Sequence, residues 1–272
     1  MMGAVVSFST MAVAGRAVFE ELDVYQLMFY RSAIGLTLVM IYAACTPGGF
    51  RKFRTHRIKL HIIRNSSHLV GQFGWFFALG LIPLAQLFAL EFTTPLWVAA
   101  LAPLLLGERL TKMRLVAVSL GFAGVLIVLR PGLEAVSLGS IVMLIGSVGF
   151  AGAMMGTKSL STTEQPVTIL FYMALVQTPV GLLLAFRDLN WPSPVTGLWL
   201  ILVAVLGFTA HFCIVRAVSL ADAIVVAPLD FIRLPLIVLV GWAFYGEMLR
   251  IEVAIGASII IASLLYTLRR ER

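Results

Sequence analysis

Charged residues are scarce in this sequence, and their scarcity excludes an ordinary water-soluble domain. Asp, Glu, Lys and Arg make up 12% of the 272 residues, hydrophobic residues make up 60%, and the mean hydropathy is +1.00. Soluble domains carry about 25% charged residues and about 45–50% apolar ones. The apolar runs are continuous rather than alternating, which disfavours a membrane β-barrel. The composition therefore predicts an all-α integral membrane protein.

Cysteines and the motifs of enzymes are also lacking. Only Cys45 and Cys213 are present, too few for a disulfide framework or a metal cluster. The sequence has no His-Glu-x-x-His, no Gly-x-Ser-x-Gly and no Gly-x-x-x-x-Gly-Lys-Ser/Thr loop. We therefore expect no metal, no cofactor, no direct use of ATP and no enzymatic activity. An intramembrane enzyme stays open as a minor alternative if His68, Glu91 and His211 converge.

The sequence contains ten apolar segments that we predict to cross the bilayer, where a spanning helix takes about 20 residues. The predicted spans are Met2–Phe19, Tyr25–Cys45, Leu60–Leu81, Leu84–Leu106, Leu115–Leu129, Leu138–Thr157, Val167–Phe186, Gly197–Leu220, Ala223–Tyr245 and Ile251–Leu268. The first could instead be a signal peptide, but no positive region precedes it. We interpret it as a retained span.

The basic residues predict the orientation of these spans. The net charge of +7 does not indicate nucleic-acid binding, because lysine and arginine gather in the cytoplasmic loops of membrane proteins. With the N-terminus inside, twelve basic residues fall in cytoplasmic loops or the C-terminal tail and four fall outside. Both termini are therefore predicted to be cytoplasmic, in a multi-pass protein of the cell inner membrane.

A repeated acidic motif divides the chain into two halves. Leu90-Glu91-Phe92 recurs as Leu229-Asp230-Phe231, and Gly107-Glu108 recurs as Gly246-Glu247, at the same offset of 139 residues. Each half holds five spans, so the second half enters the membrane from the opposite side. This arrangement is the inverted repeat of many secondary transporters. The predicted repeats are residues 1–130 and 138–272, joined by a connector at 131–137.

Three stretches of the sequence are typical of one family of membrane proteins: ALEFTTPLWVAALAPLLLGERLT, GFAGVLIVLRPG and FYRS near the start of the second span. With these stretches the sequence resembles the EamA family of the drug/metabolite transporter superfamily, over essentially the whole chain. The resemblance implies ten helices in two inverted halves and the movement of small organic solutes, often as export of amino acids and other metabolites. In the second half, Asp230-Phe231-Ile232-Arg233 departs from Glu91-Phe92-Thr93-Thr94.

Polar residues in the third predicted span mark one helical face. Arg64, His68, Gln72 and Trp75 recur at spacings of four, four and three. We predict that His68, Gln72 and Trp75 line a substrate cavity, since ionisable groups inside a bilayer usually face a cavity or a partner. A hydrogen-bonded helix interface is the alternative, and Arg64 could instead reach the cytoplasmic surface.

Glu91 is the predicted centre of the site. Thr94 shares its face, and Pro95 removes a backbone hydrogen bond beside the acid. Glu91 is a candidate proton carrier, with a salt bridge to an intramembrane arginine such as Arg31 as the alternative. Asp230 and Arg233 are three residues apart and can pair with each other, or open as a gate to a substrate carboxylate. The predicted substrate-binding residues are His68, Gln72, Trp75, Glu91, Thr94, His211, Asp230 and Arg233.

We predict a secondary active transporter that moves a small organic metabolite by alternating access. An amino acid or a related zwitterion or anion is the expected substrate, with export the expected direction and proton coupling a further hypothesis. A facilitative channel or uniporter is the alternative. The expected partners are the substrate and the lipid bilayer, and the chain is expected to be a monomer or a homodimer.

Overall fold

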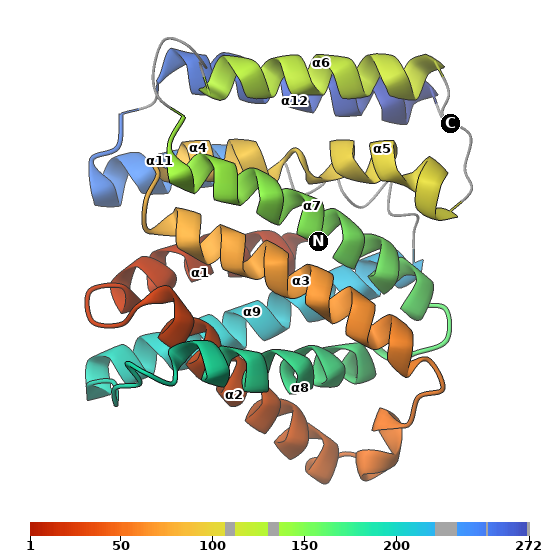
Figure 1. Cartoon of the computed structure of the whole chain (residues 1–272), viewed down its shortest axis with the longest axis vertical. Helices are drawn as coiled ribbons and strands as arrows, with labels where there is room; N and C mark the ends of the chain where they lie inside the picture. Colours follow the sequence, from red (N-terminus) through yellow and green to blue (C-terminus); the bar gives the residue numbers. More distant parts are fainter. Residues whose placement is uncertain (107–111, 130–135, 221–232, 249, 271–272) are drawn as a thin grey trace. The chain divides into compact units, whose positions relative to one another are not determined.

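The structure is a computed structural model that describes residues 1–106, 112–129, 136–220, 233–248 and 250–270 (Figure 1). These residues form helices joined by turns and short loops. Four of the helices are long and apolar enough to cross a membrane by length and composition. Four shorter apolar helices, or apolar parts of helices, accompany them. The chain is therefore an all-helical, multi-pass membrane protein.

Within the described ranges, short connections join successive helices. In chain order they are α1 (Met2–Val18), α2 (Val24–Cys45), η1 (Gly49–Phe53), α3 (Ile58–Leu79), α4 (Leu84–Glu91), α5 (Thr94–Leu106), α6 (Lys112–Leu129), α7 (Leu138–Leu160), α8 (Pro166–Ala185), α9 (Pro194–Leu220), α11 (Arg233–Tyr245) and α12 (Ile251–Arg270). The four helices that meet the length and composition criteria are α2, α7, α8 and α9.

One predicted span is wrong in form. Leu84–Leu106 was expected as a single helix, but α4 ends at Glu91 and α5 begins at Thr94. Helix α11 lies within the predicted ninth span. Asp230, the Gly107-Glu108 pair and most of the predicted connector lie outside the described residues.

The chain forms two compact units, and each unit draws on both predicted repeats. Unit 1 comprises Met1–Leu69 and Ala153–Ala221, and unit 2 comprises Val70–Gly152 and Asp222–Arg272. Helices α3 and α7 contribute one part to each unit. The division into repeats describes likeness along the sequence, whereas the units describe which segments pack together.

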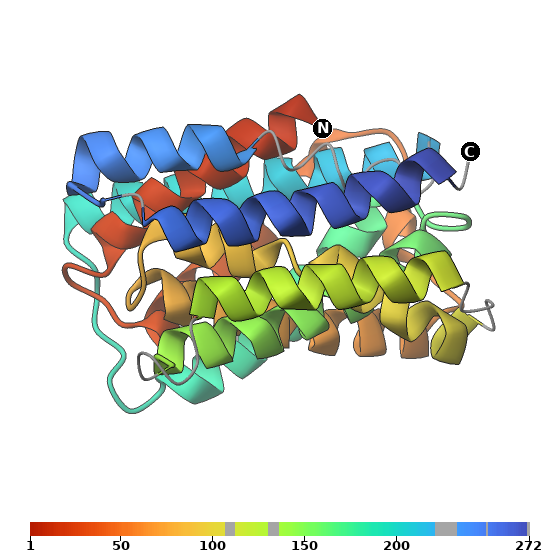
Figure 2. The ribbon, with the colours of Figure 1, turned by 90° about the horizontal axis from the view of Figure 1, so that it is seen from above.

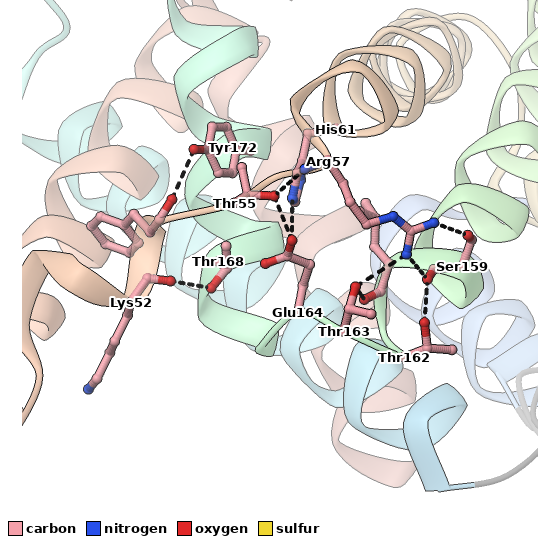
Figure 3. Close-up of polar contacts among 12 residues, drawn as sticks. Lys52, Thr55, Arg57, His61, Ser159, Thr162, Thr163, Glu164, Thr168 and Tyr172 are labelled. Atoms are coloured by element: carbon pink, nitrogen blue, oxygen red, sulfur yellow. Dashed lines mark hydrogen bonds and ion pairs between the residues drawn. The ribbon is translucent and has the colours of Figure 1, made fainter.

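In unit 1, helices far apart in the sequence are held together at both ends. Helix α2 packs on α8, and α1 packs on α9. At one end, the carboxylate of Glu21 accepts from the N–H and the hydroxyl of Ser193, both at 2.7 Å. At the other end, Arg57 donates to the Ser159 carbonyl at 2.7 Å, and Thr55 donates to Glu164 (Figure 3). The loops that meet at each end are those predicted to share one side of the membrane.

In unit 2, small residues allow close packing between α6 and α12, which lie side by side (Figure 2). A Cβ atom on Gly124 would lie 2.7 Å from the Gly256 carbonyl oxygen, so neither position tolerates a side chain without movement. Helix α4 packs on α11. Gly246 (φ 62°) follows α11, and the next residue, Glu247, accepts from the Leu84 N–H at the start of α4 (2.8 Å). A carboxylate at a helix N-terminus is stabilising, so this Gly-Glu pair helps to hold α4 against the end of α11.

Candidate functional site

The site in unit 2 is built around the break between α4 and α5. Pro95 has no N–H to offer the carbonyl of Glu91, so the helix cannot continue regularly through this point. Thr93 stabilises the break, since its hydroxyl donates to the Leu90 carbonyl at 2.7 Å and lies 2.9 Å from Ser147 Oγ. Discontinuous helices of this kind flank the sites of many transporters. The break therefore leaves Glu91 at a helix end, next to irregular backbone.

Both oxygens of Glu91 are engaged by groups from other helices. Arg233, the first residue of α11, donates from Nη2 to Glu91 Oε1 at 2.9 Å. Trp75 of α3 donates from its indole N–H to Glu91 Oε2 at 2.8 Å. The Arg233 guanidinium also lies 4.7 Å from the centre of the Phe88 ring, where a cation is attracted to the aromatic face.

This arrangement stabilises a charged carboxylate inside an apolar helix pair. Arg233 is fully buried and the Glu91 side chain is 14% exposed, so water screens the ion pair little. Breaking such a pair by removing one partner typically costs about 3–5 kcal/mol, because it leaves a buried charge uncompensated. The ion pair is therefore a strong constraint between α4 and α11.

The geometry of this ion pair bears on the predicted partners of Glu91 and Arg233. Of the alternatives for Glu91, a salt bridge to an arginine is present, and it joins Glu91 to Arg233, where Arg31 was the example expected. The predicted pair of Arg233 with Asp230 falls on a residue outside the described ones, so it stays a prediction. The contact between Arg233 and Glu91 comes from the packing of α4 on α11.

Gln72 and Thr94 contribute polar atoms that the described residues leave without a hydrogen-bond partner. The Gln72 side chain is 3% exposed, and neither its amide oxygen nor its amide nitrogen is bonded among those residues. The same is true of the Thr94 hydroxyl. Gln72 lies one helical turn before Trp75, and Thr94 lies one turn after Glu91. Buried polar groups in this state call for a bound ligand or water.

The other two predicted residues within the described part lie in unit 1, where they touch each other. His68 Nε2 lies 3.2 Å from His211 Nε2. Gln177 of α8 lies 2.8 Å from His68 Nδ1, and the sequence analysis missed this residue, although it is a lone amide in an apolar span. All four residues of the stripe on α3 are buried, but Arg64 and His68 belong to unit 1 and Gln72 and Trp75 to unit 2. Arg64 is 3% exposed, which does not fit the alternative in which it reaches the cytoplasmic surface.

Comparison with known proteins identifies the family. The EamA-like transporter family matches the chain twice, over residues 1–130 and 137–269. The chain belongs to this family. A riboflavin transporter from Brucella anthropi is 31% identical over 242 residues, which cover 87% of this chain and 85% of the relative. An S-adenosylmethionine uptake transporter from Rickettsia felis is 26% identical over 273 residues, which cover 98% of this chain and 90% of the relative.

A solved crystal structure shares the fold of this EamA-like chain. It has a TM-score of 0.73, covers 99% of this chain and 96% of its own, and is 18% identical in sequence. The family, the relatives and the apolar helices together make the chain a membrane transporter of small molecules rather than an enzyme.

Proposed function

We propose that this EamA-like protein is a secondary active transporter for nitrogen-heteroaromatic metabolites, with riboflavin as the first candidate. The two relatives are named as transporters of riboflavin and of S-adenosylmethionine. Both compounds carry a fused nitrogen heterocycle with polar edges. The observation that carries the proposal is the buried Gln72 amide. Its NH2 group donates and its carbonyl oxygen accepts, and a donor beside an acceptor is the pattern needed to bind the edge of such a ring.

The transport cycle would use the ion pair as its moving part. Alternating access needs contacts that form in one state and break in another. The Glu91–Arg233 pair joins α4 to α11, and a proton taken up by Glu91 would release Arg233. We propose proton coupling through this carboxylate, in an inner-membrane protein of ten spans arranged as inverted repeats with cytoplasmic termini.

The test is counterflow of riboflavin in proteoliposomes, followed by flavin fluorescence. Gln72→Leu is expected to weaken transport roughly 10- to 100-fold, because one or two hydrogen bonds to substrate are lost. Gln86→Leu is the matched control, since Gln86 is an amide of the same unit that already donates to Ser140 Oγ at 3.0 Å. Unchanged riboflavin counterflow in Gln72→Leu would contradict the role of this amide.

A second candidate is the export of an amino acid or another zwitterion, and the ion pair supports it. A zwitterion carries both charges needed to replace the contact, with its carboxylate facing Arg233 and its ammonium facing Glu91. The same vesicles, loaded with a panel of amino acids, distinguish the candidates. Counterflow of amino acids without counterflow of riboflavin would favour the zwitterion.

A further inference from the structure

Unit 1 contains a second polar cluster, formed by Arg64, His68, His211 and Gln177, with Arg31 beside it. We call it the basic cluster. All five side chains are buried, and they come from α2, α3, α8 and α9. The cluster does not share a residue with the Glu91 site.

Hydrogen bonding makes the cluster rich in donors. The Gln177 amide nitrogen can only donate, so His68 Nδ1 accepts, and neutral His68 then carries its proton on Nε2. His68 therefore donates to His211 Nε2, and neutral His211 is left with a proton on its Nδ1. The chain of hydrogen bonds ends in a donor.

Arg64 adds a positive charge to the cluster, and its hydrogen bonds to described residues are all with neutral groups. It donates from Nε to the Thr157 hydroxyl at 2.9 Å and from Nη1 to Asn65 Oδ1 at 2.7 Å. These bonds use two of the five donors of a guanidinium. Buried cations in a membrane are costly unless a counter-charge accompanies them. Arg64 has no carboxylate partner among the described residues.

The composition of unit 1 supports the same view. Every residue of this unit except Ala221 is described, and its five acidic residues lie in the loops that join its helices: Glu20, Glu21, Asp23, Glu164 and Asp188. Helix α9 also makes room for a cation at Gly207. A Cβ atom there would lie 2.8 Å from Arg31 Nη2, so the guanidinium occupies the space of the missing side chain.

We infer that the basic cluster is a binding site for an anionic group, a carboxylate or a phosphate. An anion would accept from the remaining donors of Arg64 and supply the counter-charge that the helices of unit 1 do not provide. The group could belong to the carried metabolite or to a separate inorganic anion. This inference extends the proposed function, because riboflavin itself carries no such group.

The experiment uses the full chain in nanodiscs of phosphatidylcholine, which carry no net charge. One arm compares the affinity of riboflavin with that of flavin mononucleotide, which adds a phosphate. If the anionic group belongs to the cargo, flavin mononucleotide binds roughly tenfold or more tightly, and Arg64→Gln abolishes the difference. The other arm measures the melting temperature against inorganic phosphate and succinate. A saturable increase that Arg64→Gln removes indicates a separate anion.

The matched control is Arg57→Gln. Arg57 precedes α3 and donates to Ser159 of α7, much as Arg64 donates to Thr157, but it lies at the end of the unit (Figure 3). It should keep the full response of the wild type. If Arg64→Gln does not fold, Arg64→Lys replaces it. Its response to the anionic probes should be weaker than that of wild type and of Arg57→Gln, but not absent.

The inference is overturned if wild type responds to none of the anionic probes, or if Arg64→Gln and Arg64→Lys respond as wild type does. Failure of the proposed function is a separate result. It would appear as absent riboflavin binding and counterflow, with the response to phosphate or succinate still present.

Discussion

Arg233 and Arg64 are both buried guanidinium groups in apolar helices, but their surroundings differ in charge. In unit 2, Arg233 meets the carboxylate of Glu91 at 2.9 Å. In unit 1, Arg64 meets the hydroxyl of Thr157 and the amide oxygen of Asn65. The first pair balances its charges within the protein, whereas the second group keeps a net positive charge. We infer that Arg233 stabilises the packing of α4 on α11 through an ion pair that a substrate or a proton can break. Arg64, in contrast, is suited to bind an anion that is not part of the protein.

The largest expected effect comes from breaking the balanced pair. Glu91→Gln should lower the free energy of unfolding by about 3–5 kcal/mol, because Arg233 keeps its buried charge and loses its partner. Thermal unfolding in detergent, followed by tryptophan fluorescence, measures the change. Glu252→Gln is the control within the same unit, since the Arg250–Glu252 pair is longer, at 3.7 Å, and partly exposed. Exposed pairs contribute about 0–1 kcal/mol. Equal losses in the two variants would show that burial does not strengthen the Glu91 pair.

The same carboxylate provides a second test through Trp75. Trp75→Phe keeps an aromatic ring against Phe76 and Phe88 but removes the N–H that binds Glu91 Oε2. A hydrogen bond to a charged group contributes about 1.5–3 kcal/mol, against about 0.5–1.5 kcal/mol for a neutral one. Trp97→Phe is the matched control, because the Trp97 indole donates to the neutral Ser147 hydroxyl at 2.8 Å. A loss in Trp97→Phe as large as that in Trp75→Phe would argue against a charged Glu91.

Replacing each arginine with an apolar side chain of similar length sharpens the contrast between the units. Arg64→Met is expected to change the free energy of unfolding by only about 1 kcal/mol, since it removes a costly buried charge and leaves no acid behind. Arg233→Met leaves Glu91 charged and buried, so it should cost about 3–5 kcal/mol. Chemical or thermal unfolding of both variants decides the matter. A large loss in Arg64→Met would mean that Arg64 serves stability rather than a ligand.

The sequence was sufficient to predict the features that depend on neighbouring residues. Outside the fourth and ninth predicted spans, continuous apolar runs located the described helices to within a few residues, because burial in lipid demands helices of that length. Pro95 marked the place where the helix beside Glu91 is interrupted, although the expected result was a loosened helix rather than two helices. The polar face of α3 was also evident from its spacing alone.

The partners of these residues could not be predicted, because they are set by packing between distant segments. Nothing in the local sequence around Arg233 indicated its contact with Glu91, which lies far away in the chain. His211 of α9 likewise contacts His68 of α3, which lies far from it in the chain. Neither contact leaves a local signal, since each depends on which helices form a compact unit.

The smallest expected effect concerns the acids that unit 1 keeps in its loops. Hydrogen bonds from the side chains of Thr196 and Ser193, and from the Ser193 N–H, hold the pKa of Glu21 below its ordinary value of 4.5. A carboxyl whose pKa is lower in the folded state stabilises the fold above its ordinary pKa, and this contribution disappears as the pH falls through the lowered value. The contact between Glu21 and the segment before α9 should therefore weaken only below about pH 4.5.

Hydrogen exchange of the Ser193 amide as a function of pH measures this weakening, with Glu21→Gln as the reference. The variant cannot ionise at position 21, so its exchange should show no step in this acidic range. Because Glu21 is exposed, the effect should stay local and leave the melting temperature nearly unchanged. A global loss of stability at the same pH would instead mean that unit 1 depends on its loop carboxylates. That result would remove the contrast with unit 2, in which the carboxylate expected to stabilise the fold is Glu91, at the end of α4.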